Sequence, residues 1–160
     1  MPEPIITFEA RTGWYGLKAR DVREIAQLRG VRPVPRAPAL FAGLAEVHGR
    51  IVTLVDLEQV VGAVAGPSAE SGFSVVLSLP FDHLGILVRT EVGVATPDEA
   101  APEESEDKGA LLYGRVLIGD RLLNLLCLPA LVARLEESIR EGFRPRPRSD
   151  SEEDGCRSAS

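Results

Sequence analysis

The sequence holds few of the residues on which catalysis, metal binding and disulfide chemistry usually depend. Its 160 residues include two cysteines, two histidines, one tryptophan and one methionine, and aromatic residues make up 5%. Cys127 falls in an apolar predicted strand and Cys156 in a polar segment, so no disulfide framework is expected and a reducing, cytoplasmic setting is favoured. Because aromatic residues are scarce, the interior must be built mainly from Val, Leu, Ile and Ala.

Basic charge and long apolar runs are also lacking. The formal net charge is −6, so the chain has no dense field of Lys and Arg to displace counterions from a nucleic acid. Charged or amide residues interrupt the most apolar region, 111–132, which leaves no run of about 18 apolar residues to cross a bilayer. The acidic, proline-containing start does not resemble a secretory signal. We therefore expect a soluble cytoplasmic protein that neither binds nucleic acid nor inserts into a membrane.

No reactive constellation is visible in the sequence. His48 and His83 lie 35 residues apart without a metal-binding spacing, and no Cys pair completes a ligand set. No serine has a G-x-S-x-G context, no glycine-rich phosphate loop occurs, and a buried Cys127 thiol would be inert. Asp56 could act as a base or cap the helical turn that follows it, and capping is favoured. We predict no catalytic, cofactor-binding or metal-binding residue, so the protein should act through its surface.

Short apolar segments separated by Gly, Pro and Asp predict a mainly β fold. Strands are expected at residues 5–10, 14–19, 22–28, 43–47, 50–57, 73–79, 83–89, 111–118 and 121–128. A proline-rich connector covers 34–43, and Gly119 can supply the positive φ that a tight hairpin turn requires. A C-terminal helix is expected from Pro129 to Gly142. Its buried face should consist of Leu131, Leu135 and Ile139.

The expected domain covers residues 5–143. Within it, the acidic stretch 96–109 has almost no side chain that could bury apolar area, and we predict an unstructured loop there. Residues 144–160 begin with alternating Arg and Pro and continue with Ser, Asp and Glu. Such a composition predicts a disordered polar tail beyond the domain.

An internal repeat organises the strands. Residues 43–61 align without a gap on residues 114–132, a shift of 71 positions, and the turn pair His48-Gly49 falls on Gly119-Asp120. The identical residues in the two copies are Gly43, Arg50, Leu54, Leu57 and Val61 and their counterparts Gly114, Arg121, Leu125, Leu128 and Val132. Because a one-residue slip would exchange the two faces of a strand, the shared phase predicts one hairpin and helical turn occurring twice. Two such units should form two small barrels over a shared core.

Four segments in order resemble the CheW-like domain, the coupling domain of bacterial chemotaxis systems. They are WYGLKARDVREI, VRPVPRAPALFAGLAEVHGRIVTLVDL, FSVVLSLPFDHLGILVRTEV and LLYGRVLIGDRLLNLLCLPALV. The most specific matches are Pro33, Pro35, Pro38, Gly43, Gly49 and Asp56. The resemblance implies two packed SH3-like β-barrels with short helices and a C-terminal helix. It also implies a non-catalytic adaptor that couples the cytoplasmic tips of chemoreceptors to the regulatory domain of a CheA-like histidine kinase.

Departures from the family pattern bear on partner choice. The family hairpin commonly contains Asn-Leu-Arg-Gly, whereas this chain has Glu46-Val47-His48-Gly49, and Arg89 stands where an aspartate is common. By resemblance, the predicted partner-binding residues are Glu24, Glu46, His48, Gly49, Arg50 and Arg89. His48 stands where family members usually present an arginine to the receptor, and the family associates a glutamate at the position of Glu24 with receptor coupling. The changes indicate a diverged adaptor of an alternative chemosensory pathway. Two alternatives stay open, namely a homologue that binds only one partner and modulates or insulates the pathway, and a small enzyme or metal protein with its site in the barrel groove.

Overall fold

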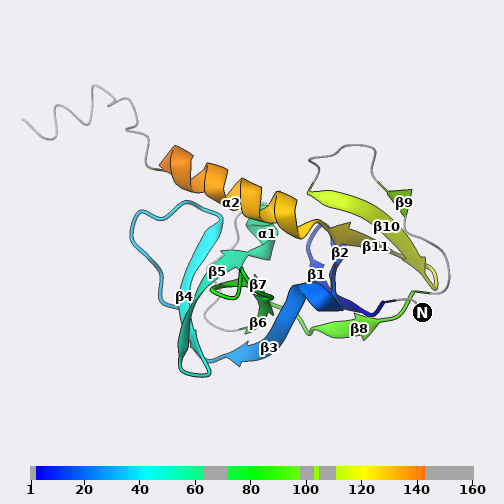
Figure 1. Cartoon of the computed structure of the whole chain (residues 1–160), viewed down its shortest axis with the longest axis horizontal. Coiled ribbons are helices and arrows are strands. Elements are labelled where there is room, and N and C mark those ends of the chain that lie inside the picture. Colours follow the sequence, from blue (N-terminus) through cyan, green and yellow to red (C-terminus); the bar gives the residue numbers. More distant parts are fainter. Residues whose placement is uncertain (1–2, 63–71, 98–102, 105–110, 143–160) are drawn as a thin grey trace, which may run out of the picture.

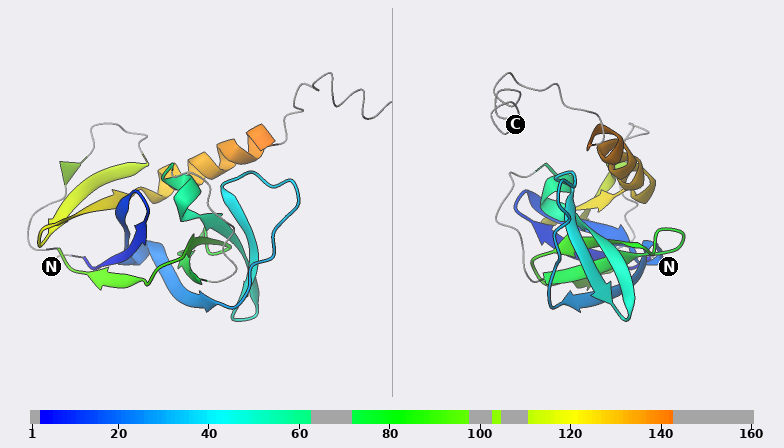
Figure 2. Two further views of the ribbon diagram at one scale, coloured as in Figure 1. Left: turned by 180° about the vertical axis from the view of Figure 1, so that it is seen from behind. Right: turned by 90° about the vertical axis from the view of Figure 1, so that its left-hand side faces the viewer.

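The structure is a computed structural model that describes residues 3–62, 72–97, 103–104 and 111–142. Two twisted sheets lie side by side, and the C-terminal helix begins beside the first and runs over the second (Figure 1, Figure 2). The six-stranded sheet has the order β8-β1-β2-β11-β10-β9 and forms the first barrel, and the five-stranded sheet has the order β3-β6-β7-β5-β4 and forms the second. No helix in the described part of the chain is long and apolar enough to span a membrane.

The first barrel takes its strands from both ends of the described chain. Its strands are β1 (Ile5–Ala10), β2 (Gly13–Lys18), β8 (Gly93–Ala95), β9 (Glu103–Glu104), β10 (Leu112–Ile118) and β11 (Arg121–Leu126). The second barrel comprises β3 (Val22–Leu28), β4 (Phe41–Val47), β5 (Arg50–Asp56), β6 (Gly72–Leu77) and β7 (Leu84–Val88). The helices are η1 (Ala19–Asp21), α1 (Leu57–Val60) and α2 (Leu128–Gly142).

The predicted duplication is confirmed by the strand registers. In the β4–β5 hairpin Gly43 lies opposite Leu54, and in the β10–β11 hairpin Gly114 lies opposite Leu125. Every partner pair of the first hairpin recurs 71 positions later, including the bulge next to the glycine. Each hairpin also adds a parallel neighbour, β7 beside β5 and β2 beside β11. The same hairpin is therefore built twice, and each copy leads into a helix.

The two hairpin turns use positive backbone φ values. His48 has φ 48° and Gly49 has φ 80°, which is the pattern of a type I′ turn. In the other hairpin Gly119 has φ 63°, as predicted from its sequence position. These turns match the right-handed twist of the strands on either side, so each hairpin closes with two residues.

A shared core joins the barrels. It combines Phe8 and Leu17 of the first barrel with Val55, Ile86 and Val88 of the second, together with residues of α1 and α2. Two smaller clusters fill the individual barrels, around Leu54 in the second and around Leu123 in the first. The predicted packing of two lobes over one core is confirmed, and it explains how lobes this small remain stable.

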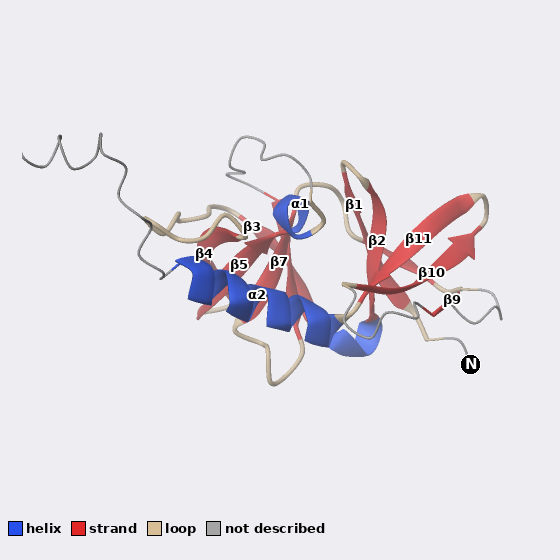
Figure 3. Ribbon diagram, turned by 90° about the horizontal axis from the view of Figure 1, so that it is seen from above, coloured by secondary structure: helices blue, strands red, loops and turns tan. Residues whose placement is uncertain are grey.

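Helix α2 begins at Leu128, one residue before the predicted start, and lies across the second barrel (Figure 3). Leu131 and Leu135 are buried in the shared core, as predicted. The prediction for Ile139 was wrong, because its side chain is 41% exposed. Its four-residue spacing places it on the same face of the helix, but the core that receives this face ends at Leu135. Helical periodicity predicts which face is apolar and says nothing about where the neighbouring core ends.

Other sequence expectations need correction. Cys127 was predicted inside a buried strand, yet β11 ends at Leu126 and the thiol is half-buried. Its carbonyl accepts the first helical hydrogen bond, from the Leu131 amide at 2.9 Å, so helix formation takes the residue out of the sheet. The sequence also missed β8 and β9, and β9 lies inside the stretch predicted as an unstructured loop. Strand pairing with β1 and β10 forms these two short segments. Residues 98–102, 105–109 and 144–160, with Cys156, lie outside the described residues.

Gly85→Ala is expected to lower the free energy of unfolding by about 1–3 kcal/mol, because the core has no room for the added methyl group. A Cβ at this position would lie 2.3 Å from Ser74 Oγ and 3.1 Å from Val52 Cγ1. The Ser74 hydroxyl is buried and has no hydrogen-bond partner among the described residues. Ser74→Ala should therefore be tolerated, and Gly85→Ala should destabilise less in that background. Equal losses in both backgrounds, measured by urea denaturation, would contradict this explanation.

Candidate functional site

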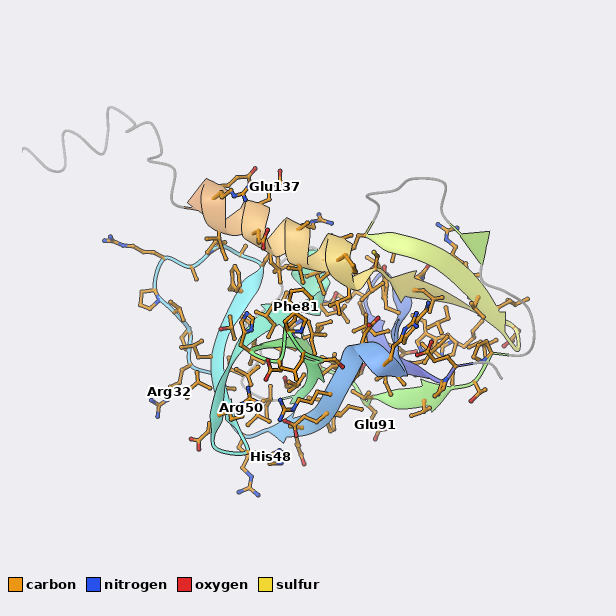
Figure 4. All side chains as sticks on the ribbon, in the orientation of Figure 1. Arg32, His48, Arg50, Phe81, Glu91 and Glu137 are labelled. Carbon is orange, nitrogen blue, oxygen red and sulfur yellow. The ribbon has the colours of Figure 1, made fainter. Side chains whose placement is uncertain are left out.

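Five of the six predicted partner-binding residues gather at one end of the second barrel. Glu24 lies on β3, Glu46 on β4, His48 and Gly49 in the hairpin turn, and Arg50 at the start of β5. Figure 4 shows His48 and Arg50 at the end of the barrel that is farther from α2. The hairpin turn brings the last four together, and the sheet brings Glu24 to them from a distant part of the sequence. We call this set the hairpin face.

Glu24 and His48 are in direct contact on the hairpin face. His48 Nδ1 lies 2.7 Å from Glu24 Oε2, although 24 residues separate them in the chain. The His48 side chain is 73% exposed and the Glu24 side chain 29% exposed. The pair therefore presents a flat ring and a carboxylate to the outside, in a fixed mutual orientation. Groups of this kind can bind a polar partner.

Arg50 is part of a second contact, which the sequence alone did not indicate. Asp82, between β6 and β7, accepts hydrogen bonds from Arg50 Nη2 and from Arg23 Nη1, the latter at 2.9 Å. The hydrogen bond from Arg50 is the main reason that the pKa of Asp82 lies below its ordinary value. The carboxylate is therefore ionised at neutral pH, where it can hold both guanidinium groups. No local pattern in the sequence connects residues 23, 50 and 82.

Arg89 is not part of the hairpin face. It follows β7, and because β7 runs parallel to β5, it lies at the opposite end of the sheet from the hairpin turn. Its Nη1 and Nη2 donate to Asp56 Oδ1 and Oδ2 at 3.1 and 3.0 Å. Asp56 also accepts from the Glu58 amide at 3.0 Å, which confirms the predicted cap of α1. The structure thus joins Arg89 to the helix cap.

A groove opens beside the hairpin face, between β3 and β4. These strands are the two edges of the five-stranded sheet. At one end of the groove, backbone hydrogen bonds between Arg32 and Leu44, both 2.8 Å, connect the segment that follows β3 to β4. At the other end, the Glu24–His48 contact connects β3 to the hairpin turn. The groove has a volume of about 870 Å³. Its lining includes Ile25, Arg29, Arg32, Glu46, His48 and Ile51.

Exposed apolar groups on the groove suit it to binding a protein surface. Ile25 and Ile51 are among the exposed large hydrophobic residues of the described chain. Arg29 and Arg32 lie on the same groove, and neither forms an ion pair with another described residue. No group of three His, Cys, Asp or Glu residues that could hold a metal ion occurs in the described ranges. The groove therefore offers apolar contact beside charged groups, with Arg29 and Arg32 as its cations and Glu46 as an anion.

Comparison with known proteins identifies the family. Residues 4–136 match the family model described as the CheW-like domain. The chain belongs to the CheW-like domain family. The chain is also 28% identical over 89 residues to "Chemotaxis protein CheW" of Treponema pallidum (strain Nichols), an alignment that covers 52% of each protein. It thus spans about half the length of this relative.

A solved structure supports the CheW-like fold. The chain matches the scaffolding protein TtCheW from Thermoanaerobacter tengcongensis with a TM-score of 0.68 and 22% identity. The match covers 80% of this chain and 90% of the solved one. The predicted mainly β fold, with two packed SH3-like lobes, is confirmed by this match and by the two sheets. At this identity the likeness concerns the fold.

Proposed function

We propose that this CheW-like protein is a non-catalytic adaptor of the cytoplasm that couples chemoreceptor signalling tips to a CheA-like histidine kinase. Family membership supports this proposal, since the family model covers most of the chain. The observation that carries it is the contact between Glu24 and His48 beside the open groove. These residues occupy the two positions that the family resemblance associates with the receptor, and they meet on one exposed surface. The hairpin face and the groove adjoin each other, so one small domain can hold two partners.

The hairpin face is the proposed receptor contact. A receptor tip is a helical hairpin, and Glu24, Glu46 and His48 can exchange hydrogen bonds and charge contacts with polar side chains along such a helix. Gly49 contributes the shape of the turn through its φ of 80°. Arg89 stays a proposed contact of a different kind, since its side chain is 28% exposed while its terminal nitrogens hold Asp56. Its remaining exposed edge is what a partner could touch.

The groove between β3 and β4 is the proposed kinase contact. Protein interfaces place exposed aliphatic groups at their centre and charged groups at the margin, and Ile25 and Ile51 with Arg29 and Arg32 follow that arrangement. A regulatory domain built of similar barrels would present strand edges of matching size. Because the groove adjoins the hairpin face, kinase and receptor would lie next to each other on the second barrel.

A two-bait binding experiment tests this assignment. The purified chain is offered a receptor signalling-tip fragment and, separately, a CheA-like regulatory domain. Ile51→Glu is expected to weaken capture of the kinase domain roughly tenfold, because it places a charge in an apolar contact. Leu122→Glu, at the equivalent position of the first barrel, is the matched control and should leave this capture unchanged. Binding of neither bait by the unaltered chain would refute the adaptor function.

A single-partner homologue is the second candidate. His48 replaces the arginine that the family presents to receptors, and a histidine lacks the fixed charge and the two-pronged donor set of a guanidinium. Arg89 stands at a usual aspartate position, and its charge is held by Asp56. Capture of the kinase domain without capture of the receptor tip would favour this function. Such a protein would modulate or insulate a pathway.

A further inference from the structure

The Asp82 carboxylate joins three separate elements next to the hairpin face. Its Oδ2 accepts from Arg23 on β3 and from Arg50 at the start of β5, while Asp82 itself lies between β6 and β7. The Asp82 side chain is 14% exposed, whereas the two arginine side chains are about half exposed. One mostly covered carboxylate thus holds two half-exposed cationic side chains from different strands.

We propose that Asp82 is a positioning residue that holds the β4–β5 hairpin turn against β3 so that Glu24 and His48 meet. This inference rests on the proposed function of the hairpin face. Arg23 directly precedes Glu24, and Arg50 lies two residues after His48, at the end of the turn. The carboxylate therefore fixes a residue close to each member of the pair. Neither Asp82 nor Arg23 belongs to the predicted partner-binding set.

The strand pairing explains why the turn needs such support. Each edge of the five-stranded sheet pairs on one side only, β4 with β5 and β3 with β6. The backbone bridge from Arg32, in the segment after β3, to Leu44 of β4 lies at the far end of the groove. At the near end, among the described residues, side chains alone connect the hairpin to β3. A two-stranded hairpin tip held only by its own turn moves readily, and a fixed tip binds with a smaller loss of conformational entropy.

The equivalent hairpin of the first barrel provides an internal comparison. Arg121 occupies the place of Arg50, and it pairs with Glu9 at the end of β1. Its guanidinium also lies over the Trp14 ring, with its central carbon 4.5 Å from the ring centroid. Within the described residues, Glu9 forms an ion pair with Arg121 but with no second arginine, and no contact between a glutamate and a histidine lies beside it. The doubled contact on Asp82 is therefore specific to the barrel that carries the hairpin face.

Stability is not the main role of the Asp82 contact. Ion pairs whose arginine side chains are about half exposed contribute little to folding, since water competes for the guanidinium groups and the side chains lose freedom. The Asp82 carboxylate instead fixes the two arginines beside Glu24 and His48, and so sets the geometry of that pair, as supporting groups do around binding sites. Loss of Asp82 should therefore change binding more than unfolding.

Asp82→Asn in the full chain is the test, and Glu9→Gln is the matched control. In Asp82→Asn, amide exchange at residues 47–51 should accelerate roughly three- to tenfold. Dissociation from a receptor signalling-tip fragment should accelerate roughly three- to tenfold as well. The melting temperature should change by less than about 3 °C. Glu9→Gln should alter neither the exchange at 47–51 nor the dissociation. Asp82→Glu, which keeps the charge, should restore part of the lost binding.

Each outcome separates this inference from the proposed function. Unchanged exchange and dissociation in Asp82→Asn would overturn the positioning role. A large drop in melting temperature with faster exchange throughout the chain would also overturn it, since it would assign Asp82 a structural role. If the unaltered chain does not bind the receptor fragment, the receptor function fails, and the exchange rates at 47–51 still decide whether Asp82 holds the turn.

Discussion

Leu54→Ala and Leu125→Ala are each expected to lower the free energy of unfolding by about 2–5 kcal/mol, since both remove a fully enclosed side chain and leave a cavity. Leu54 is 0% exposed and Leu125 is 1% exposed. They occupy equivalent positions in the duplicated hairpins, each opposite the glycine of a bulge. Equivalent surroundings predict losses of similar size. Chemical denaturation followed by circular dichroism would measure both.

Exposed neighbours in the same two strands supply the control for these core substitutions. Ile51→Ala and Leu122→Ala are also an equivalent pair, and their side chains are exposed. Each should change stability by less than about 0.5 kcal/mol. A small loss for one buried leucine together with a large loss for the other would show that the two hairpins are not energetically equivalent. In that case, the two hairpins would share their strand pairing but not their contribution to stability.

His48→Glu is expected to weaken binding of a receptor signalling tip roughly tenfold or more, because it places a second carboxylate where Glu24 now has a partner at 2.7 Å. Glu46 adds further negative charge on the same face. The melting temperature should hardly change, since the turn buries little area and the His48 side chain is mostly exposed. Isothermal titration against the receptor fragment, with thermal denaturation alongside, would measure both quantities.

His48→Asn is the appropriate control for the effect of charge. The turn requires a left-handed backbone at residue 48, where φ is 48°, and asparagine adopts this conformation more readily than most residues. This variant keeps the turn and removes the imidazole ring, so it should lie between the unaltered chain and His48→Glu in affinity. Equal losses of stability and binding in His48→Glu would mean that residue 48 is structural.

Much of the fold could be predicted from local sequence pattern. The alternation of apolar residues located most strands, and the glycine at 119 and the aspartate at 56 correctly indicated a turn and a helix cap. These features depend on a few neighbouring residues, so the sequence contains the information directly. The short strands β8 and β9 had no such pattern, because pairing with β1 and β10 creates them. The half-buried position of Cys127 likewise depends on where the sheet gives way to α2.

The candidate site likewise combines residues that are neighbours in the sequence with residues that only the fold brings together. Glu46, His48, Gly49 and Arg50 are neighbours in the sequence, so a hairpin brings them together in any fold that keeps the turn. The residues that contact this set in the folded chain are distant in the sequence, so no local pattern predicts them. Glu24 reaches His48 from β3, Asp82 reaches Arg50 from the β6–β7 connection, and Asp56 engages Arg89. Nothing in the sequence indicated where Arg89 lies relative to the others, because the direction of β7 carries it to the far end of the sheet.

Local sequence pattern was enough to show that one hairpin and helical turn occur twice, since the phase of apolar residues must agree with the buried face of each strand. It also determined which residues form each turn, because the left-handed backbone there suits few residue types. Which charged residues meet depends on the folded arrangement of the strands. The order and direction of the strands in the five-stranded sheet pair Glu24 with His48, Arg23 and Arg50 with Asp82, and Arg89 with Asp56. That order depends on packing of the whole core, which no short segment of the chain encodes.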